Sequence, residues 1–365
     1  MRQVLAASPL VPRRQWSWAN HRALCGWLSD VCRGAGGAAV FDWDNTAICN
    51  DVSFATLRYL LGTRHRLSLG LRQLAELLPE AVGGVARLAA GPTLSDVRDA
   101  ILSAYEEVLW QLDVGRADVR RSVALRDFRA RLLWYYAACE ETPGIGAAFA
   151  YPWLAQLFCG LEPAALSQLA RGAIAAVCAE RFGTQEVWQS RLSWRRGAAQ
   201  EETVVSVMLR HGLAAQEEIR DLMRVLRLAG VDIYVVSASC QPLVRVCAEV
   251  LGYPIAPPHI AGQPLACRDG YFVAEPPWVY EGHLPHGAGK SAIVRQHFGV
   301  APILVAGDSN GDHHMLTSFP ETQVRLVIDC GHGGAIAALC KRPAYDGGVM
   351  TLVQKRDWER GGWMD

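Results

Sequence analysis

Two aspartates and a threonine follow a short apolar run near the start of the chain. Residues Ala38 to Thr46 (AAVFDWDNT) read as a buried strand that presents Asp42 and Asp44 at its carboxyl end, with Thr46 two residues later. In open α/β sheets, ligands bind in the crevice outside the carboxyl ends of the strands. The motif could therefore place a carboxylate nucleophile, a second acid and a hydroxyl on one loop. The alternative is an ordinary strand exit whose acids face water.

Further polar residues stand where later predicted strands end and a later helix begins. They are a serine at the end of the strand 231–237, a lysine at a helix start, and two aspartates in the GDSNGD loop after the strand 302–306: Ser237, Lys290, Asp308 and Asp312. If these strands are parallel, their carboxyl ends lie at one edge of the sheet. We therefore expect the four side chains to converge on the first acid pair.

The residue types of this set suit phosphoryl chemistry. Three carboxylates need a cation beside them, because like charges a few ångströms apart oppose ionisation. Oxygen ligands suit Mg²⁺, which also accepts a phosphate oxygen of the substrate. A hydroxyl, a lysine and loop amides can hold a phosphoryl group, and an aspartate can serve as nucleophile through an aspartyl-phosphate.

The composition is that of a globular protein with room for two domains, or for one large domain with an insertion. The chain has 365 residues, of which 51% are hydrophobic and 20% charged. The formal net charge of +0 argues against nucleic-acid binding, which requires a basic surface. The 11 cysteines form no Cys-x-x-Cys pair and no Cys/His zinc spacing. Scattered thiols indicate a reducing compartment, so we expect a cytoplasmic protein.

Two segments bear on export and on membranes. The start of the chain, Met1 to Arg14, has an apolar piece interrupted by a serine and a proline, and it is a poor signal peptide. Residues 142–161 carry no charged side chain, but prolines and glycines interrupt them. We therefore expect a buried helix and loop there, with no membrane span and no membrane partner.

The order of predicted elements indicates an α/β core with a helical insertion. Apolar residues at helical spacing predict helices over 16–32, 54–61, 68–78, 94–112, 116–139, 164–182 and 214–229, with no strong strand between 53 and 230. Beyond residue 230, strands alternate with helices, which predicts a parallel doubly wound sheet. We also expect a hairpin over 259–275, with its turn at Asp269-Gly270, and a last strand over 324–328. The tail 342–365 has no readable pattern. We assign 1–52 and 228–365 to the core and 53–227 to the insertion.

The four motifs, taken in order, resemble those of the haloacid dehalogenase superfamily of phosphotransferases. They are FDWDNT at 41–46, VVSAS at 235–239, Lys290, and GDSNGD at 307–312. The resemblance covers roughly 30–52 and 228–330, and the insertion resembles the family's C1 cap, which sets substrate specificity. Within the superfamily, the second and fourth motifs look most like those of phosphoserine and phosphorylcholine phosphatases, as do the segments 151–160 and 354–363.

The resemblance implies a role for each motif residue. Asp42 would be the nucleophile and Asp44 the general acid and base, which dehalogenase members lack. Mg²⁺ would be held by Asp42, Asp308 and the backbone carbonyl of Asp44. The phosphoryl group would be bound by Thr46, Ser237, Ala238 and Lys290. The metal and the lysine would be supported by Ser309 and Asp312.

Asp51 bears on the identity of the substrate. Phosphoserine phosphatases carry an acid nine residues after the nucleophile, which binds the substrate's ammonium group, and Asp51 stands at that offset; it could equally cap the next helix. Aromatic faces also bind ammonium groups, and the candidates, each of which could instead be a core residue, are Trp43, Trp110, Trp134, Tyr135, Tyr136, Tyr151 and Trp153. The resemblance thus implies phosphorylcholine, phosphoethanolamine or phosphoserine as substrate. His283 and His286, before Lys290, receive no role.

Two other functions remain open at this point. A phosphotransferase would pass the phosphoryl group to an acceptor alcohol, and a catalytically silent module would only bind phosphate. The intact set of motif residues argues against the silent module, because a binding module does not need both an acid pair and a metal acid.

Overall fold

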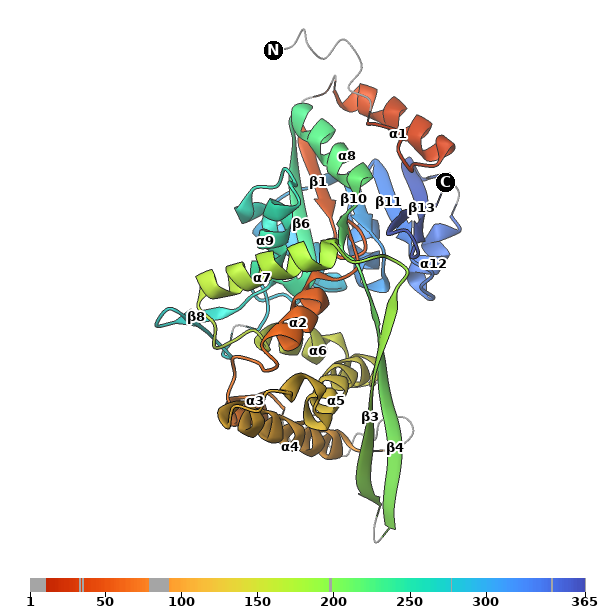
Figure 1. Ribbon diagram of the computed structural model, residues 1–365. Helices are drawn as coiled ribbons and strands as arrows, with labels where there is room; N and C mark the ends of the chain where they lie inside the picture. Colours follow the sequence, from red (N-terminus) through yellow and green to blue (C-terminus); the bar gives the residue numbers. More distant parts are fainter. Residues whose placement is uncertain are drawn as a thin grey trace.

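The computed structural model describes residues 11–364, apart from 33, 35, 79–91, 197, 198, 277 and 343. Most of the segment interpreted as a poor signal peptide lies outside the described residues. Figure 1 shows the sheet and its flanking helices in the upper part of the molecule, with a helical region and a long hairpin below them.

A mainly parallel sheet forms the centre of the upper part. The strand β1 (Gly37–Phe41) lies between β6 (Val231–Cys240) and β10 (Pro302–Gly307), and it is parallel to both. The full order is β12-β13-β11-β10-β1-β6-β7, and β14 (Gly362–Trp363) pairs with β13. The other strands of this order are β7 (Ile260–Gln263), β11 (Val324–Asp329), β12 (Tyr345–Asp346) and β13 (Val349–Asp357). The sequence prediction of a mainly parallel sheet is confirmed.

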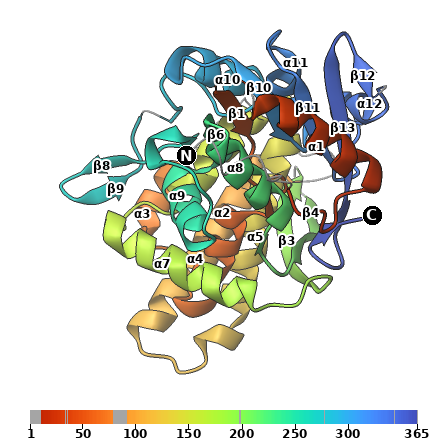
Figure 2. The same ribbon diagram turned by 90° about the horizontal axis from the view of Figure 1, so that it is seen from above.

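Helices cover both faces of this sheet (Figure 2). Successive side chains of a strand point to opposite faces, and β1 shows this alternation. Its residues Ala39 and Phe41 pack in one apolar core with residues of α1 (Trp18–Val31), α8 (Glu217–Leu228) and α9 (Gln241–Val250). Its residues Ala38 and Val40 pack in a second core with residues of the π-helical turn Ile293–His297, which follows α10 (Ala288–Ala292), and of α11 (His313–Thr317) and α12 (Ala335–Cys340).

The chain leaves this sheet region after β1 and returns before α8. The short strands β2 (Ile48–Cys49) and β5 (Ala214–Ala215) pair antiparallel, so the departing and returning segments lie side by side. The helices between them are α2 (Val52–Thr63), α3 (Leu71–Leu77), α4 (Leu94–Asp113), the 3₁₀ turn Val119–Arg121, α5 (Val123–Glu141), α6 (Ala147–Gln156) and α7 (Pro163–Cys178).

The prediction that this region holds no strong strand is wrong. A long antiparallel hairpin, β3 (Gln185–Arg196) and β4 (Ala199–Arg210), follows α7. It packs along α5, where Arg131 Nε donates to Ser190 Oγ at 2.9 Å and the Arg129 guanidinium lies over the Trp188 ring. One face of β4 is exposed throughout, and it carries the apolar residues Val204 and Met208. Apolar side chains therefore occur on both faces of the strand, and the sequence shows no clean alternation.

The structure also shows how the segments 259–275 and 142–161 and the C-terminal tail compare with their predicted structures. In 259–275, β7 joins the main sheet, and only β8 (Ala266–Arg268) and β9 (Tyr271–Val273) form a hairpin, which turns at Asp269-Gly270 as predicted. In 142–161, α6 and its flanking loops are largely buried, as predicted. The tail supplies β12 to β14. Within the described residues, no helix is long and apolar enough to cross a membrane.

Candidate active site

The acid pair lies where β1 ends. The Asp42 N–H still donates to the Ala306 carbonyl at 2.9 Å, so the parallel ladder extends one residue beyond the strand. A tight turn follows, in which the Ala47 N–H donates to the Trp43 carbonyl at 2.8 Å and Asn45 adopts a φ of 57°. Asparagine tolerates this left-handed conformation better than most residues do. The turn returns Thr46 towards Asp42, with 3.3 Å between Thr46 Oγ1 and Asp42 Oδ2.

Lys290 connects the first motif with the last. Its Nζ lies 2.5 Å from Asp42 Oδ1 and 2.6 Å from Asp312 Oδ1, and the lysine is only 3% exposed. Burial alone would lower the pKa of this amine, but the two carboxylates outweigh burial and raise it above its usual value. The lysine is therefore held as a cation between the two acids, because each of them stabilises its charged form.

The loop after β10 holds Asp312 and places Asp308, which is also buried, beside the first motif. Asp312 Oδ2 accepts hydrogen bonds from the backbone N–H groups of Asp308 (3.1 Å) and Ser309 (3.0 Å), and from Ser309 Oγ (2.9 Å). A Cβ on Gly307 would lie 2.5 Å from the Asp312 Cβ, so only glycine permits this close approach. Asp308 faces the first motif, where Thr46 Oγ1 lies 3.2 Å from its Oδ1 and the Asp42 carboxyl lies nearby.

The four buried acids differ in how readily they ionise. Burial and the charge of Asp312 raise the pKa of Asp42 to about 6, and the same causes raise the pKa of Asp308 well above its usual value. Burial would also raise the pKa of Asp312, but Lys290 and Ser309 hold it below its usual value. Burial and the nearby Asp51 raise the pKa of Asp44 to about 8. Asp44 therefore retains its proton near neutral pH, which a general acid requires.

The carboxylates of Asp42, Asp308 and Asp312 lie close enough to hold a metal ion. One oxygen from each lies within 4.8 Å of the others. The Asp312 oxygens are already occupied by Lys290 and by the 308–309 loop, so Asp42 and Asp308 are the side chains that remain for coordination. Hard oxygen donors of this kind fit Mg²⁺. The Asp44 carboxyl is held elsewhere, by the Val52 N–H (2.8 Å) and by Ser237 Oγ (3.3 Å).

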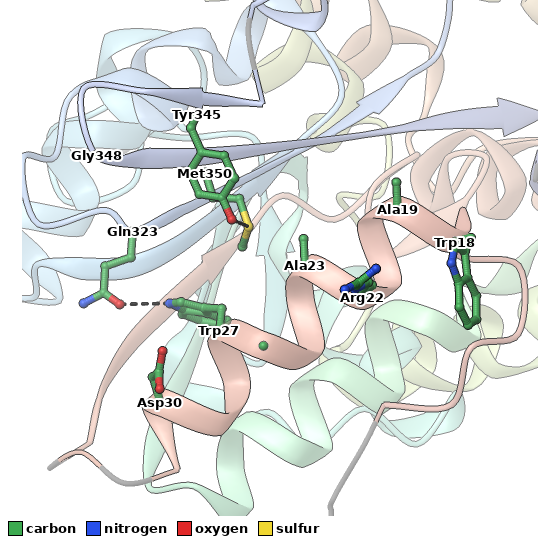
Figure 3. Close-up of a pocket in the computed structure, with 11 residues that line it drawn as sticks. Trp18, Ala19, Arg22, Ala23, Trp27, Asp30, Gln323, Tyr345, Gly348 and Met350 are labelled. Carbon is green, nitrogen blue, oxygen red and sulfur yellow. Dashed lines mark hydrogen bonds between the residues drawn. The ribbon is translucent and has the colours of Figure 1, made fainter.

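A cavity of about 280 Å³ opens above these acids. Most of the residues predicted for the site line it, namely Asp42, Asp44, Asp51, Ala238, Lys290, Asp308 and Ser309. The other three lie beneath the lining, where they contact lining residues: Thr46, Ser237 and Asp312. The structure therefore brings all ten predicted residues to one place. Figure 3 shows a larger hollow of about 800 Å³ between α1 and β12–β13, which none of them lines.

The opposite wall of the cavity combines carboxylates with aromatic rings. Asp51 caps α2 by accepting from the Phe54 N–H at 2.8 Å, and it also lines the cavity. Tyr136 and Tyr151 line the cavity with Phe54, and the Phe54 and Tyr136 ring centroids lie 5.0 Å apart. The other aromatic candidates do not line it; Trp43 packs edge-on against Tyr253 in the core.

Sequence reasoning missed several lining residues, of which Glu140 and His286 contact the Tyr151 side chain. Glu140, on the last turn of α5, accepts a hydrogen bond from the Tyr151 hydroxyl at 2.6 Å. His286, in the loop before α10, packs edge-on against the Tyr151 ring. No sequence signal marked Glu140, because it stands beside Glu141 near a helix end, where charged residues are common. The proximity of His286 to Lys290 in the chain was the one available indication.

Comparisons with known proteins agree with this architecture. Residues 142–317 match the family model described as haloacid dehalogenase-like hydrolase. The matched segment contains the second, third and fourth motifs, and the structure places the first motif beside them. The match spans 176 of the 365 residues, so this part of the chain is similar to haloacid dehalogenase-like hydrolases. The fold class is α/β with a mainly parallel sheet.

One solved structure of similar fold covers nearly the whole chain. A conserved functionally unknown protein from Anaerococcus prevotii is 24% identical with a TM-score of 0.82, and the match covers 98% of this chain and 97% of that chain. A protein of unknown function from Bordetella pertussis is 13% identical with a TM-score of 0.45, and the match covers 87% of this chain and 99% of that chain. A substrate-bound phosphoserine phosphatase is 11% identical with a TM-score of 0.37, and the match covers 87% of this chain and 93% of that chain. No curated protein sequence matches the chain.

Proposed function

We propose that the protein is a Mg²⁺-dependent phosphomonoester hydrolase that works through an aspartyl-phosphate on Asp42. The observation that supports this most strongly is the buried Lys290, which bridges Asp42 and Asp312 next to Asp308 at the floor of an open cavity. A carboxylate nucleophile that is neutralised by a lysine, with a second acid free for a metal, suits attack on an anionic phosphoryl group.

Each of two steps breaks one P–O bond and forms another. An Asp42 carboxylate oxygen attacks phosphorus while the bond to the leaving alcohol breaks, and Asp44 gives that oxygen its proton. Asp44, now ionised, takes a proton from water as the water oxygen attacks phosphorus and the bond to Asp42 breaks. Lys290 and the loop at Ala238 hold the phosphoryl oxygens throughout. Mg²⁺, held by Asp42 and Asp308, would offset the negative charge of the phosphoryl group.

The cavity wall supports an amine-bearing leaving group. Asp51 and Glu140 supply negative charge, and Phe54, Tyr136 and Tyr151 supply aromatic faces, which together attract an ammonium group. Phosphorylcholine, phosphoethanolamine and phosphoserine are the candidate substrates. The inserted segment 53–227, proposed as the cap, contributes all of these groups except Asp51, so it would select the substrate.

A phosphomonoester panel tests the reaction class. We expect phosphate release with Mg²⁺, none after chelation, and recovery when Mg²⁺ is restored. The Asp42→Asn variant should lose turnover while keeping the circular dichroism spectrum of the parent. Asp232→Asn, at an exposed position of β6, is the matched control and should keep full activity. Turnover by Asp42→Asn equal to that of the parent would refute the proposed nucleophile.

A second comparison tests the substrate class. Glu140→Gln should raise KM for phosphoethanolamine about tenfold or more, because it removes a half-buried negative charge from the proposed ammonium site. A hydrogen bond to a charged group contributes about 1.5–3 kcal/mol. The KM for a neutral alcohol phosphate such as ethyl phosphate should hardly change. Glu141→Gln, at the exposed neighbouring position, is the control. Equal changes in KM for both substrates would exclude ammonium recognition by Glu140.

A further inference from the structure

A cysteine and a histidine lie beside Asp308 on a loop to which no function has been assigned. This loop follows β11 and contains Cys330 and His332. Asn310 ties it to the active-site loop, since its Nδ2 donates to the Gly333 carbonyl at 2.9 Å and its Oδ1 accepts from the Ile336 N–H at 3.0 Å. The two loops therefore keep a defined position relative to each other.

The three side chains present metal-binding atoms towards one another. One ligand atom each from Asp308, Cys330 and His332 lies within 4.8 Å of the other two, and His332 Nε2 lies 3.8 Å from Asp308 Oδ2. A tetrahedral zinc site with bonds of about 2.0–2.3 Å separates its ligand atoms by roughly 3.3–3.8 Å. The side chains are thus close to coordinating distances, and the exposed His332 can adjust its position. It also lines the active-site cavity, which gives an ion a route of entry.

The donor atoms distinguish this cluster from the proposed magnesium site. Asp42 and Asp308 offer only oxygen, which suits Mg²⁺, whereas a thiolate and an imidazole favour softer ions such as Zn²⁺. Three protein ligands leave the fourth position of a tetrahedral zinc ion for water. Asp308 belongs to both sets, so one carboxylate would be shared between two competing ions.

We propose that Asp308, Cys330 and His332 form a Zn²⁺ site whose occupation inhibits the enzyme. The ion would draw Asp308 away from the position that it needs in order to hold Mg²⁺ with Asp42. The inhibition rests on the proposed function, because it presumes that Asp308 is a magnesium ligand. The binding of zinc does not rest on it, because it depends only on the three donor atoms.

Spectroscopy and calorimetry test the binding without reference to activity. Co²⁺ added to the full-length protein in place of Zn²⁺ should produce a thiolate-to-metal charge-transfer band, and calorimetry should detect one Zn²⁺ bound. Both signals should survive in Cys340→Ser, a control at a half-buried thiol outside the cluster. In Cys330→Ser the band should vanish, and Zn²⁺ affinity should fall at least tenfold. Persistence of the band in Cys330→Ser, or no zinc binding by the parent, would overturn the site.

Activity measurements test the inhibition separately. In saturating Mg²⁺, Zn²⁺ should inhibit the parent and Cys340→Ser alike, and Cys330→Ser should require at least tenfold more Zn²⁺ for the same inhibition. Equal sensitivity of Cys330→Ser would overturn the inhibitory role. A parent protein that binds Zn²⁺ through Cys330 but releases no phosphate with Mg²⁺ alone would refute the proposed function and support the zinc site, so the two failures are distinguishable.

Discussion

Removal of the Lys290 charge should destabilise the protein strongly, and the loss should depend on pH. Lys290 is buried and lies 2.5 Å from Asp42 and 2.6 Å from Asp312. Lys290→Met leaves two buried carboxylates facing each other without their cation, and breaking a buried ion pair in this way costs about 3–5 kcal/mol. We expect a loss of this size in the free energy of unfolding at pH 8, measured by urea denaturation in the presence of a chelator.

The sign of the pH dependence follows from the carboxylates. Without the lysine, the pKa values of Asp42 and Asp312 in the folded protein should lie above those in the unfolded chain, which are about 3.9. A raised pKa means that the folded state binds more protons, so the variant should lose stability as pH rises through the folded pKa values and regain it towards pH 5.5. The deficit relative to the parent should therefore be smaller at pH 5.5 than at pH 8.

Two further variants make this reasoning refutable. Lys290→Met/Asp312→Asn removes one of the stranded charges and should recover at least about 1.5 kcal/mol, even if the single variant does not fold. Its activity should stay low, because the lysine that holds the phosphoryl group is absent. Lys341→Met, at an exposed position, should change stability by less than about 0.5 kcal/mol. A Lys290→Met variant as stable as the parent at pH 8, or a double variant no better than the single one, would contradict the argument.

Three more predictions follow from the site and the core. The proposed acid Asp44 has a pKa of about 8, so kcat should fall as pH rises above about 8. In Asp44→Asn, kcat should be roughly 10²–10⁴-fold lower and should no longer fall above about pH 8, which a pH–rate profile would show. Arg356 is 1% exposed and donates to the Asn45 carbonyl beside the acid pair. Arg356→Lys should lower kcat by about tenfold, because lysine lacks the planar set of donors of a guanidinium group. An unchanged kcat would mean that Arg356 does not position this loop. Leu304 is fully buried in β10, and Leu304→Ala should cost about 2–5 kcal/mol in urea denaturation, whereas the same change at the exposed Leu228 should cost less than about 0.5 kcal/mol.

The sequence by itself determined the core sheet and the floor of the site. β1, β6 and β10 are short apolar strands that end in polar motifs, and parallel strands must bring those ends to one edge. The positions of Asp42, Ser237 and Asp308 at that edge therefore follow from local patterns and from one topological rule. Lys290 joins them because a motif at a helix start marks it.

Only the tertiary structure decided what surrounds that floor. Contacts between segments far apart in the chain placed Glu140 and Tyr151 over the cavity. Nothing in the local sequence marks Glu140, and only the structure separated Tyr151 from the aromatic candidates that do not line the cavity. The hairpin β3–β4 escaped prediction because the exposed face of its second strand carries Val204 and Met208, so apolar residues do not alternate with polar ones. The convergence of Cys330 and His332 on Asp308 depends on Asn310, which ties two loops together across the sheet edge. Local sequence patterns predict strands and their ends. The cavity wall of carboxylates and aromatic rings, and the metal-binding atoms beside Asp308, arise from tertiary packing that no local pattern predicts.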